Sequence, residues 1–325
     1  MNTLSDPNLR RAVARAPRAE DGTLRALDAS RSGITDLSGI ERYPQLRVLR
    51  LDHNELTDLG PLAGLPNLTG LFLSFNQLTD LRPLAGLDRL PALGLRGNRI
   101  TDATPLAGMT SLTWLDLYGN ALGELRFARE LHYLTRLDLG ANSLTAAPEL
   151  RGHGRLRSLE LTDNRIGSLA GLDELPALEH LDAAQNRITD LTPLAGLTTL
   201  TSVNLRANRI GSLAPLRGLS GLRSLDLSEN PLHDLEPLAG LTELRSLYLW
   251  ASGTTDLAPL AGLVRLRQLG LADNAVRDIR PLAGLTELDL LFLGGNEGIH
   301  AGQLAGLRQR PGADLRGPDW KTHRP

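Results

Sequence analysis

The stretch "LTGLFLSFNQLTDLRPLAGL" (68–87) combines regularly spaced leucines with one asparagine and the phrase Pro-Leu-Ala-Gly-Leu. Similar stretches follow one another every 22 residues from about residue 24 to residue 300, which makes thirteen repeats in one register. Serine replaces the shared asparagine in two repeats, at Ser32 and Ser252, and the other repeats have Asn54, Asn76, Asn98, Asn120, Asn142, Asn164, Asn186, Asn208, Asn230, Asn274 and Asn296. Such strict periodicity predicts a solenoid in which the repeats stack on one another.

Each repeat predicts a short strand followed by a tight return turn. In the motif L-x-L, the leucines point to one side of the strand and the variable residues to the other. The asparagine stands where the chain leaves the strand, so its amide is expected to bond backbone groups that would otherwise be buried and unpaired. In the return phrase D-L-x-P-L-A-G-L, the aspartate is a candidate helix N-cap and the proline lies in the first turn. The length of this phrase fits a single 3₁₀ or short α-helical turn.

The stacked repeats predict an α/β solenoid with the shape of a horseshoe or arc. Its parallel sheet of about thirteen strands should lie on the concave side, above a continuous leucine core. We expect an N-terminal cap (1–23), the repeat array (24–300) and a C-terminal cap or tail (301–325). The tail, including Trp320, should cover the exposed edge of the last strand. Three return segments, 124–134, 146–156 and 168–178, lack the Pro-Leu-Ala-Gly phrase, so the middle of the convex side should differ from its ends.

The chain resembles the bacterial internalin-type leucine-rich repeat proteins. The resemblance rests on the 22-residue period, on phrases such as "NRITDLTPLAGL" (186–197), and on "DPNLRRAV" (6–13) followed by "LDASRSGITDLSGIE" (27–41), which look like the helical cap and first repeat of that family. It implies a non-catalytic module that recognises proteins through its concave sheet. Unlike the secreted members, the chain is expected to have no signal peptide, wall-sorting signal or further C-terminal module. An adhesin whose export signal lies upstream of Met1 is therefore an alternative.

Composition excludes several functional classes. The chain contains no cysteine, which rules out disulfides, thiolate catalysis and Cys-based metal sites. A net charge of -2 is not that of a protein adapted to nucleic acid or to an anionic membrane surface. The N-terminus lacks the apolar core of a signal peptide, and no apolar run approaches the roughly 18 residues of a membrane helix. We expect a cytoplasmic monomer without cofactor or metal.

Aromatic side chains concentrate at the variable strand positions. Seven of the eleven aromatic residues lie there: Phe72, Phe75, Trp114, Tyr118, Tyr248, Trp250 and Phe292. The first group flanks a strand that carries Ala92, Gly94, Arg96 and Gly97, and the second flanks Gly270 and Ala272. Large rings beside a small-residue floor predict two troughs, whose rings would anchor a partner as aromatic residues do in interfaces. The alternative is that the rings only cover one another and stiffen the sheet.

A column of mostly acidic residues occupies the middle of successive L-x-L motifs. Its members are Asp116, Asp138, Glu160, Asp182, Asn204 and Asp226. Neighbouring carboxylates would stand about 5 Å apart, and like charges on adjacent strands are unfavourable. Cations, raised pKa values or a basic partner would relieve this repulsion, and Arg136, Arg206 and His180 are expected to relieve part of it. A solvated polar face that is merely tolerated is the alternative.

These patterns favour a module that binds a protein or extended peptide with basic and apolar segments. The aromatic residues with Gly94 and Arg96, and the five acidic members of the column with Arg136, Arg206 and His180, are the predicted partner-binding residues. A rival hypothesis is an enzyme or accessory biosynthetic factor that uses Asp138, Glu160, His180 and Asp182. It would require a deep local pocket, because the fold itself carries no chemistry.

Overall fold

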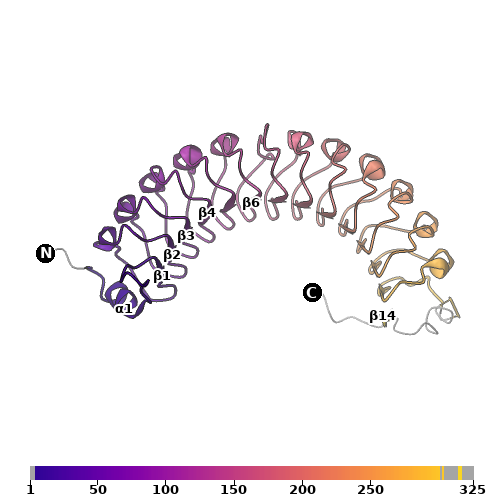
Figure 1. Cartoon of the computed structure of the whole chain (residues 1–325). Helices are drawn as coiled ribbons and strands as arrows, with labels where there is room; N and C mark the ends of the chain where they lie inside the picture. The colour runs from indigo at the N-terminus through magenta and orange to yellow at the C-terminus, as the bar shows by residue number, and fades with distance from the viewer. Residues whose placement is uncertain (1–3, 301, 304–313, 317–325) are drawn as a thin grey trace. The chain divides into compact units, whose positions relative to one another are not determined.

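The computed structural model describes residues 4–300, 302–303 and 314–316. The chain forms two compact units, Met1–Asn164 and Arg165–Pro325, which are described separately. Within each unit, the strands lie along the inner side of the curved backbone path and the 3₁₀ turns along the outer side (Figure 1). The predicted α/β solenoid of repeats is thereby confirmed.

The N-terminal unit begins with one α-helix and continues with stacked repeats. Helix α1 (Pro7–Arg15) precedes a set of three-residue strands, each of which pairs in parallel with the next. The strands are β1 (Ala26–Asp28), β2 (Val48–Arg50), β3 (Gly70–Phe72), β4 (Ala92–Gly94), β5 (Trp114–Asp116), β6 (Arg136–Asp138) and β7 (Ser158–Glu160). The 3₁₀ helices are η1 (Ile40–Arg42), η2 (Gly60–Gly64), η3 (Arg82–Leu84), η4 (Thr104–Gly108) and η5 (Arg126–Glu130).

The C-terminal unit has the same construction. Its strands are β8 (His180–Asp182), β9 (Ser202–Asn204), β10 (Ser224–Asp226), β11 (Ser246–Tyr248), β12 (Gln268–Gly270), β13 (Leu290–Phe292) and β14 (Asp314–Arg316). Its 3₁₀ helices are η6 (Leu172–Glu174), η7 (Thr192–Leu194), η8 (Ala214–Gly218), η9 (Glu236–Leu238), η10 (Ala258–Leu260) and η11 (Arg280–Gly284). Strands β1 to β13 fall on the predicted motifs. Strand β14 adds one more and pairs in parallel with β13, which confirms that the tail covers this edge; Trp320 lies outside the described residues.

The asparagine ladder holds neighbouring repeats together as predicted. Asn54 Oδ1 accepts hydrogen bonds from the backbone N–H groups of Ser32 and Ile34, and its Nδ2 donates to the carbonyls of Ala29 (3.0 Å) and Leu51 (2.9 Å). Each asparagine thus satisfies polar backbone groups next to a fully buried leucine core. Ser252 reaches less far, since its Oγ donates to a single backbone carbonyl, that of Leu249, at 2.8 Å.

The return turns are 3₁₀ helices, one of the two forms expected. Their aspartates do not stand at the N-cap. In η2 the N-cap is Leu59, and Asp58 Oδ1 accepts the N–H of Gly60, the first helical residue, at 2.8 Å. The aspartate therefore caps the turn from one residue further back than predicted. Among the described residues, no helix has the length and apolar character needed to cross a membrane.

One of the three irregular return segments departs from the common structure. Segments 124–134 and 168–178 retain η5 and η6, whereas 146–156 contains no 3₁₀ helix. Here His153 stands 22 residues after Leu131, at a position that leucine holds in most repeats. Its imidazole is fully buried, with Nε2 3.0 Å from the carbonyl oxygen of Ala128 and with Nδ1 unpartnered among the described residues. Burial lowers the pKa of His153, and the nearby ring of His132 lowers it further.

We expect His153→Leu to make the protein more resistant to acid. Because the folded-state pKa lies below the ordinary histidine value of 6.5, the unfolded chain takes up the proton first, and stability falls as the pH drops below that value. Above it the histidine is neutral in both states and contributes no pH dependence. The variant should melt at a higher temperature at pH 5, with a smaller gain at pH 8 from removing the unpartnered nitrogen. A control, His180→Gln at an exposed position, should leave the pH profile unchanged; equal profiles for all three proteins would contradict the interpretation.

Candidate functional site on the sheet face

The first aromatic cluster covers the sheet face of the N-terminal unit. The rings of Phe72 and Trp114, from β3 and β5, have centroids 5.9 Å apart and meet above Gly94 of the strand between them. A Cβ atom at Gly94 would lie 3.4 Å from both rings. The ring of Tyr118 similarly lies over Gly140, where a Cβ atom would come within 2.7 Å of it. The glycines thus make room for the rings.

Arginine side chains cover the faces of two rings in this cluster, and a histidine stacks on a third. The guanidinium of Arg50 lies 4.2 Å from the centroid of Phe72, and that of Arg96 lies 3.8 Å from the centroid of Tyr118. His53 stacks on Phe75 with centroids 4.4 Å apart. Such contacts hold the rings in defined orientations.

Gly97, expected to form part of a floor, has a backbone role. The residue before the ladder asparagine adopts a left-handed conformation throughout the array, and Gly97 has φ +65° there. Phe75 occupies the same position one repeat earlier with φ 57°, which is uncommon for a bulky side chain. A Cβ atom at Gly97 would lie 2.6 Å from the nearest carbon of the Phe75 ring. Nine other non-glycine residues share this conformation at the same position, so it belongs to the repeat; what distinguishes Phe75 is that this large apolar side chain is 43% exposed.

The second aromatic cluster lies on the C-terminal unit. Trp250 makes edge contacts with both Tyr248 and Phe292, with ring centroids 5.8 and 5.7 Å away. Trp250 also covers Gly270, because a Cβ atom there would lie 2.0 Å from its Nε1. That Nε1 is buried and has no hydrogen-bond partner among the described residues.

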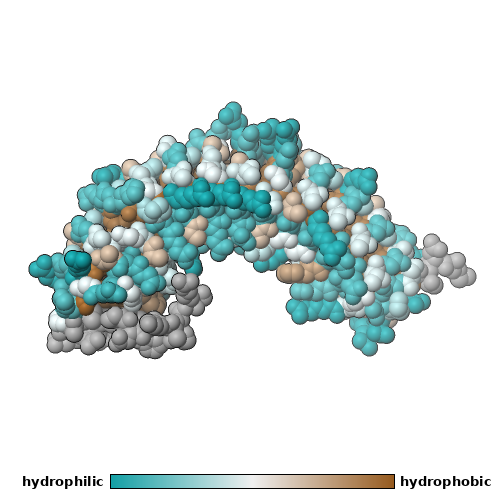
Figure 2. All heavy atoms as spheres, turned by 180° about the vertical axis from the view of Figure 1, so that it is seen from behind, coloured by the Kyte–Doolittle hydropathy of each residue, from teal (hydrophilic) through white to brown (hydrophobic). Residues whose placement is uncertain are grey.

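The expectation of open troughs is therefore wrong at Gly94 and Gly270. At both positions the rings fold over the glycine instead of standing as walls on either side of it. The sheet face presents two aromatic patches of half-buried rings, and the view in Figure 2 shows hydrophobic residues exposed in patches within a largely hydrophilic surface. The rings do cover one another, as the alternative hypothesis states. That hypothesis assigns no role to the exposed half of each ring.

The acidic column exists in each unit. Asp116, Asp138 and Glu160 are register partners on β5, β6 and β7. In the C-terminal unit Asp182, Asn204 and Asp226 are register partners on β8, β9 and β10.

Most of these residues also have a structural role. Oδ1 of Asp116, Asp138, Asp182 and Asp226 accepts the backbone N–H two residues further on, at 2.9–3.0 Å. Asn204 does the same for Arg206, at 3.1 Å. Aspartate and asparagine therefore recur here partly because they satisfy a donor where each strand ends.

Burial changes the ionisation of two members of the column. It raises the pKa of Asp116 and of Asp182, while the hydrogen bond that each accepts from the backbone opposes this shift. Neighbouring carboxylates contribute less: Asp52 to the pKa of Asp116, and Asp226 to that of Asp182. The predicted rise in pKa thus occurs at two positions, mainly through desolvation rather than through repulsion within the column.

One of the expected counter-charges, Arg206, is placed differently from the prediction. Arg206 forms an ion pair with Glu229 (2.8 Å), outside the column, and Asp182 Oδ2 accepts a hydrogen bond from the amide of Asn204 (3.0 Å). Arg136 and His180 are exposed on their strands. Within the described part of the chain, no group of three or more His, Cys, Asp or Glu side chains is arranged to hold a metal ion.

Sequence reasoning missed several residues of this surface. Arg50 caps Phe72, Asp52 accepts the backbone N–H of Ser74 (2.8 Å), and Gln268 accepts the hydroxyl of Tyr248. Arg50 and Phe72 occupy equivalent positions in adjacent repeats, so a search for cations next to aromatic residues in one column would have found this pair.

Comparison with known proteins agrees with the architecture. A family model described as Leucine Rich repeats (2 copies) matches residues 44–86, 154–195, 176–218 and 220–262. The crystal structure of an internalin, InlF from Listeria monocytogenes, superposes with a TM-score of 0.90 at 28% identity and covers 98% of this chain and 96% of that one. The chain is a leucine-rich repeat protein with an internalin-like structure. Leucine-rich repeat folds of this kind are generally non-catalytic and typically bind proteins.

Two more distant leucine-rich repeat structures share the fold alone. A protein of Leptospira interrogans has 22% identity and a TM-score of 0.68, with 94% of this chain and 98% of that chain covered. The plant peptide hormone receptor RGFR1, solved in complex with RGF2, has 20% identity and a TM-score of 0.61; the match covers 79% of this chain and 53% of the receptor. No protein of curated function matches the sequence.

Proposed function

We propose that this leucine-rich repeat protein binds a protein or an extended peptide through the sheet face of its repeats. The observation that carries the proposal is the pair of aromatic patches, whose rings are held by glycines, cations and one another while staying half exposed. Rigid aromatic side chains lose little conformational freedom on binding and are typical anchors in interfaces. Phe75, a large apolar side chain that is 43% exposed, adds accessible aromatic surface to the first patch.

The acidic residues favour a partner with basic groups. In each unit the acidic column directly adjoins the aromatic patch, since Gly94 pairs in register with Asp116 and Tyr248 with Asp226. A segment that carries apolar and basic side chains in alternation would meet both surfaces. Peptide recognition by this fold has a precedent in the RGFR1–RGF2 complex.

Trp114→Ala combined with Tyr118→Ala should abolish capture of the partner from an extract of the source cells. Both rings pack over glycines, so the double variant should melt at a lower temperature yet remain folded at 20 °C by circular dichroism. The control is Tyr133→Ala, which removes a more exposed ring (52% exposed) that contacts Arg155 away from the sheet face. Undiminished capture by the folded double variant, or an equal loss with the control, would refute the proposal.

The cytoplasmic location and the monomeric state stay predictions from the sequence. The enzyme hypothesis at Asp138 and Asp182 has no support in the geometry, because both carboxylates accept hydrogen bonds from backbone N–H groups as part of the scaffold.

A further inference from the structure

Two adjacent repeats of the C-terminal unit depart from the repeat pattern at neighbouring positions. Pro231 follows the ladder asparagine of the first repeat, and the second repeat reads Ser252-Gly253-Thr254. Thr254 takes the place of the leucine, isoleucine or valine that most repeats bury two residues after the ladder position. The second repeat thus loses the asparagine amide and one aliphatic side chain together.

These substitutions rearrange the backbone hydrogen bonds between the two repeats and leave a local opening at Gly253. In most other repeats the residue after the ladder position donates its N–H to the preceding repeat, as from Arg209 to the Ile188 carbonyl at 2.9 Å. Pro231 has no N–H to donate. Among the described residues, no backbone hydrogen bond joins Gly253 N–H to Leu232 C=O; the Leu232 N–H instead donates to the Ser252 carbonyl at 3.1 Å.

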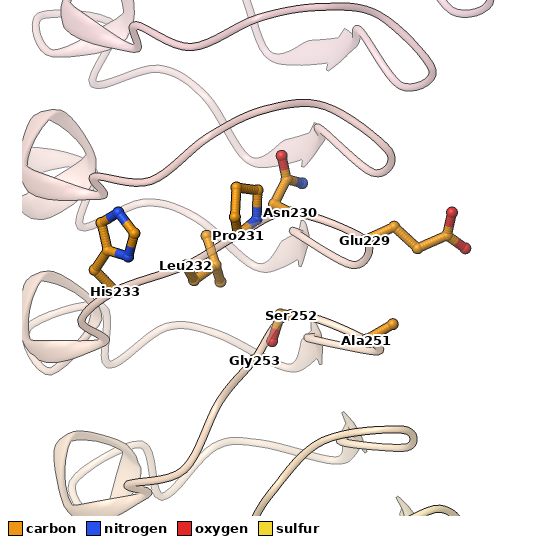
Figure 3. A pocket seen from close by; sticks show the side chains of 8 residues that line it. All are labelled: Glu229, Asn230, Pro231, Leu232, His233, Ala251, Ser252 and Gly253. Carbon is orange, nitrogen blue, oxygen red and sulfur yellow. The ribbon is translucent and has the colours of Figure 1, made fainter.

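A groove follows from this opening. A hollow of about 590 Å³ lies between the loops of the two repeats, with Glu229 and His233 at its opposite ends (Figure 3). A smaller hollow of about 170 Å³ adjoins it and shares Leu232, His233 and Gly253 with it; we call the two together the inter-repeat groove. Leu232 is 8% exposed there, whereas its counterparts in other repeats, such as Ile210, are completely buried. The larger hollow is within the usual range of ligand sites, roughly 300–1,000 Å³.

The groove combines an apolar floor with negative charge. Pro231, Leu232 and Ala251 supply apolar surface. Asp234 and Asp256 line the smaller hollow, and no lysine or arginine is among the described residues that line either hollow.

Asp234 and Asp256 occupy equivalent positions in the two repeats, 22 residues apart. Asp234 Oδ1 accepts the N–H of Glu236 and Asp256 Oδ1 that of Ala258, each at 2.8 Å, as part of the capping of η9 and η10. Glu229, at the other end, is already paired with Arg206. The unpaired negative charge therefore lies at the end near η9 and η10.

We propose that the inter-repeat groove binds an arginine or lysine side chain on a basic segment of a partner protein. The aliphatic stem of such a side chain covers Leu232 and Pro231, as long cationic side chains do on apolar surface, and its charged head reaches Asp234 and Asp256. Gly253 N–H and Leu232 C=O offer the segment one donor and one acceptor for its own backbone. This site lies apart from the aromatic patches and does not depend on their function.

The test uses the full chain and two small probes, N-acetyl-arginine amide and the uncharged isostere N-acetyl-citrulline amide. In NMR titrations of the deuterated protein, the arginine probe should cause saturable shifts at Gly253 and at the neighbouring Thr255. The citrulline probe should bind about two- to fivefold more weakly, because ion pairs with exposed carboxylates contribute up to about 1 kcal/mol. Equal binding of both probes, or shifts that avoid the groove, would overturn the proposal.

Two variants and one matched control locate the binding. Ser252→Asn with Thr254→Ile restores the repeat pattern and fills the groove, so it should remove arginine binding without lowering the melting temperature. Asp234→Asn with Asp256→Asn keeps both capping oxygens and removes only the charge, so it should weaken binding about two- to fivefold. Asp190→Asn makes the same change at η7, outside the groove, and should have no effect. Binding that survives both groove variants would show that the arginine probe binds elsewhere.

Discussion

Asn208→Ala is expected to lower the free energy of unfolding by about 3 kcal/mol, the cost of orphaning a buried N–H and losing further hydrogen bonds. The Asn208 side chain is 8% exposed, and its Oδ1 accepts the N–H of fully buried Ile188 at 3.0 Å. Its Nδ2 donates to the carbonyls of Ala183 and Leu205, both at 2.9 Å. Those carbonyls each keep another ladder donor, from Asn186 and Asn230, so the orphaned N–H of Ile188 dominates the cost.

Urea denaturation followed by circular dichroism measures this effect. Asn67→Ala is the control, because Asn67 is exposed and donates one hydrogen bond to the Pro44 carbonyl; its loss should cost less than about 0.5 kcal/mol. Asn208→Ser should fall between wild type and alanine, since Ser252 shows that a serine in the ladder keeps one backbone bond. Equal midpoints for Asn208→Ala and Asn67→Ala would mean that the ladder does not stabilise the solenoid.

Asp6→Ala is expected to release the N-terminal helix from the repeats and to cost about 2–3 kcal/mol, as for loss of an N-cap together with a charged hydrogen bond. One carboxylate oxygen, Oδ1, accepts the N–H groups of Asn8 (2.8 Å) and Leu9 (3.0 Å) at the start of α1. The other, Oδ2, accepts the N–H of Thr35 in the first repeat at 2.9 Å. Helix α1 buries Leu9 and Val13, so its release would expose the end of the leucine core.

The same contact should make the cap sensitive to acid. Burial by itself would raise the pKa of Asp6, but the backbone hydrogen bonds from Thr35, Leu9 and Asn8 outweigh it and hold the pKa below the ordinary aspartate value of 3.8. The stabilisation is therefore complete above that value and is lost as the pH falls through the lower folded-state pKa.

Hydrogen exchange at Leu9 and Thr35 should report this loss, because the cap opens locally before the whole chain unfolds. Asp6→Asn retains one acceptor for the helix and loses the charge, so it should show an intermediate loss. Wild-type exchange rates at Thr35 in Asp6→Ala would contradict the proposed role.

The arrangement of the repeats could be predicted because it rests on local chemistry that recurs. Each strand, each ladder asparagine and each 3₁₀ turn depends on residues within one repeat and on the similar repeats on either side of it. Thirteen copies of the same pattern leave one register that buries every leucine. The cap before the array was predicted from the resemblance of "DPNLRRAV" (6–13) to the helical cap of internalin-type proteins. The structure shows there an N-cap aspartate, a proline in the first turn and two buried apolar positions.

The shape of the candidate surface could not be predicted in this way. The sequence placed Trp250 and Gly270 on neighbouring strands, but whether the ring stands beside the glycine or lies over it depends on a rotamer and on contacts with Tyr248 and Phe292. Similarly, the backbone bonds that occupy Asp116 and Asp138 are visible only once the path of the chain beyond each strand is known.

From its sequence alone, this protein is determined to be a solenoid of leucine-rich repeats with a helical cap and a variable sheet face. The 22-residue period, the alternation of leucines and the register of the asparagines are sufficient to predict this fold. Every repeat must bury the same leucines and satisfy the same backbone groups. Only the tertiary structure decided that the rings close over Gly94 and Gly270, that His153 is buried with an unpartnered nitrogen, and that a groove opens at Gly253. These features arise where one repeat differs from its neighbours, and there the outcome depends on how unlike side chains pack in three dimensions.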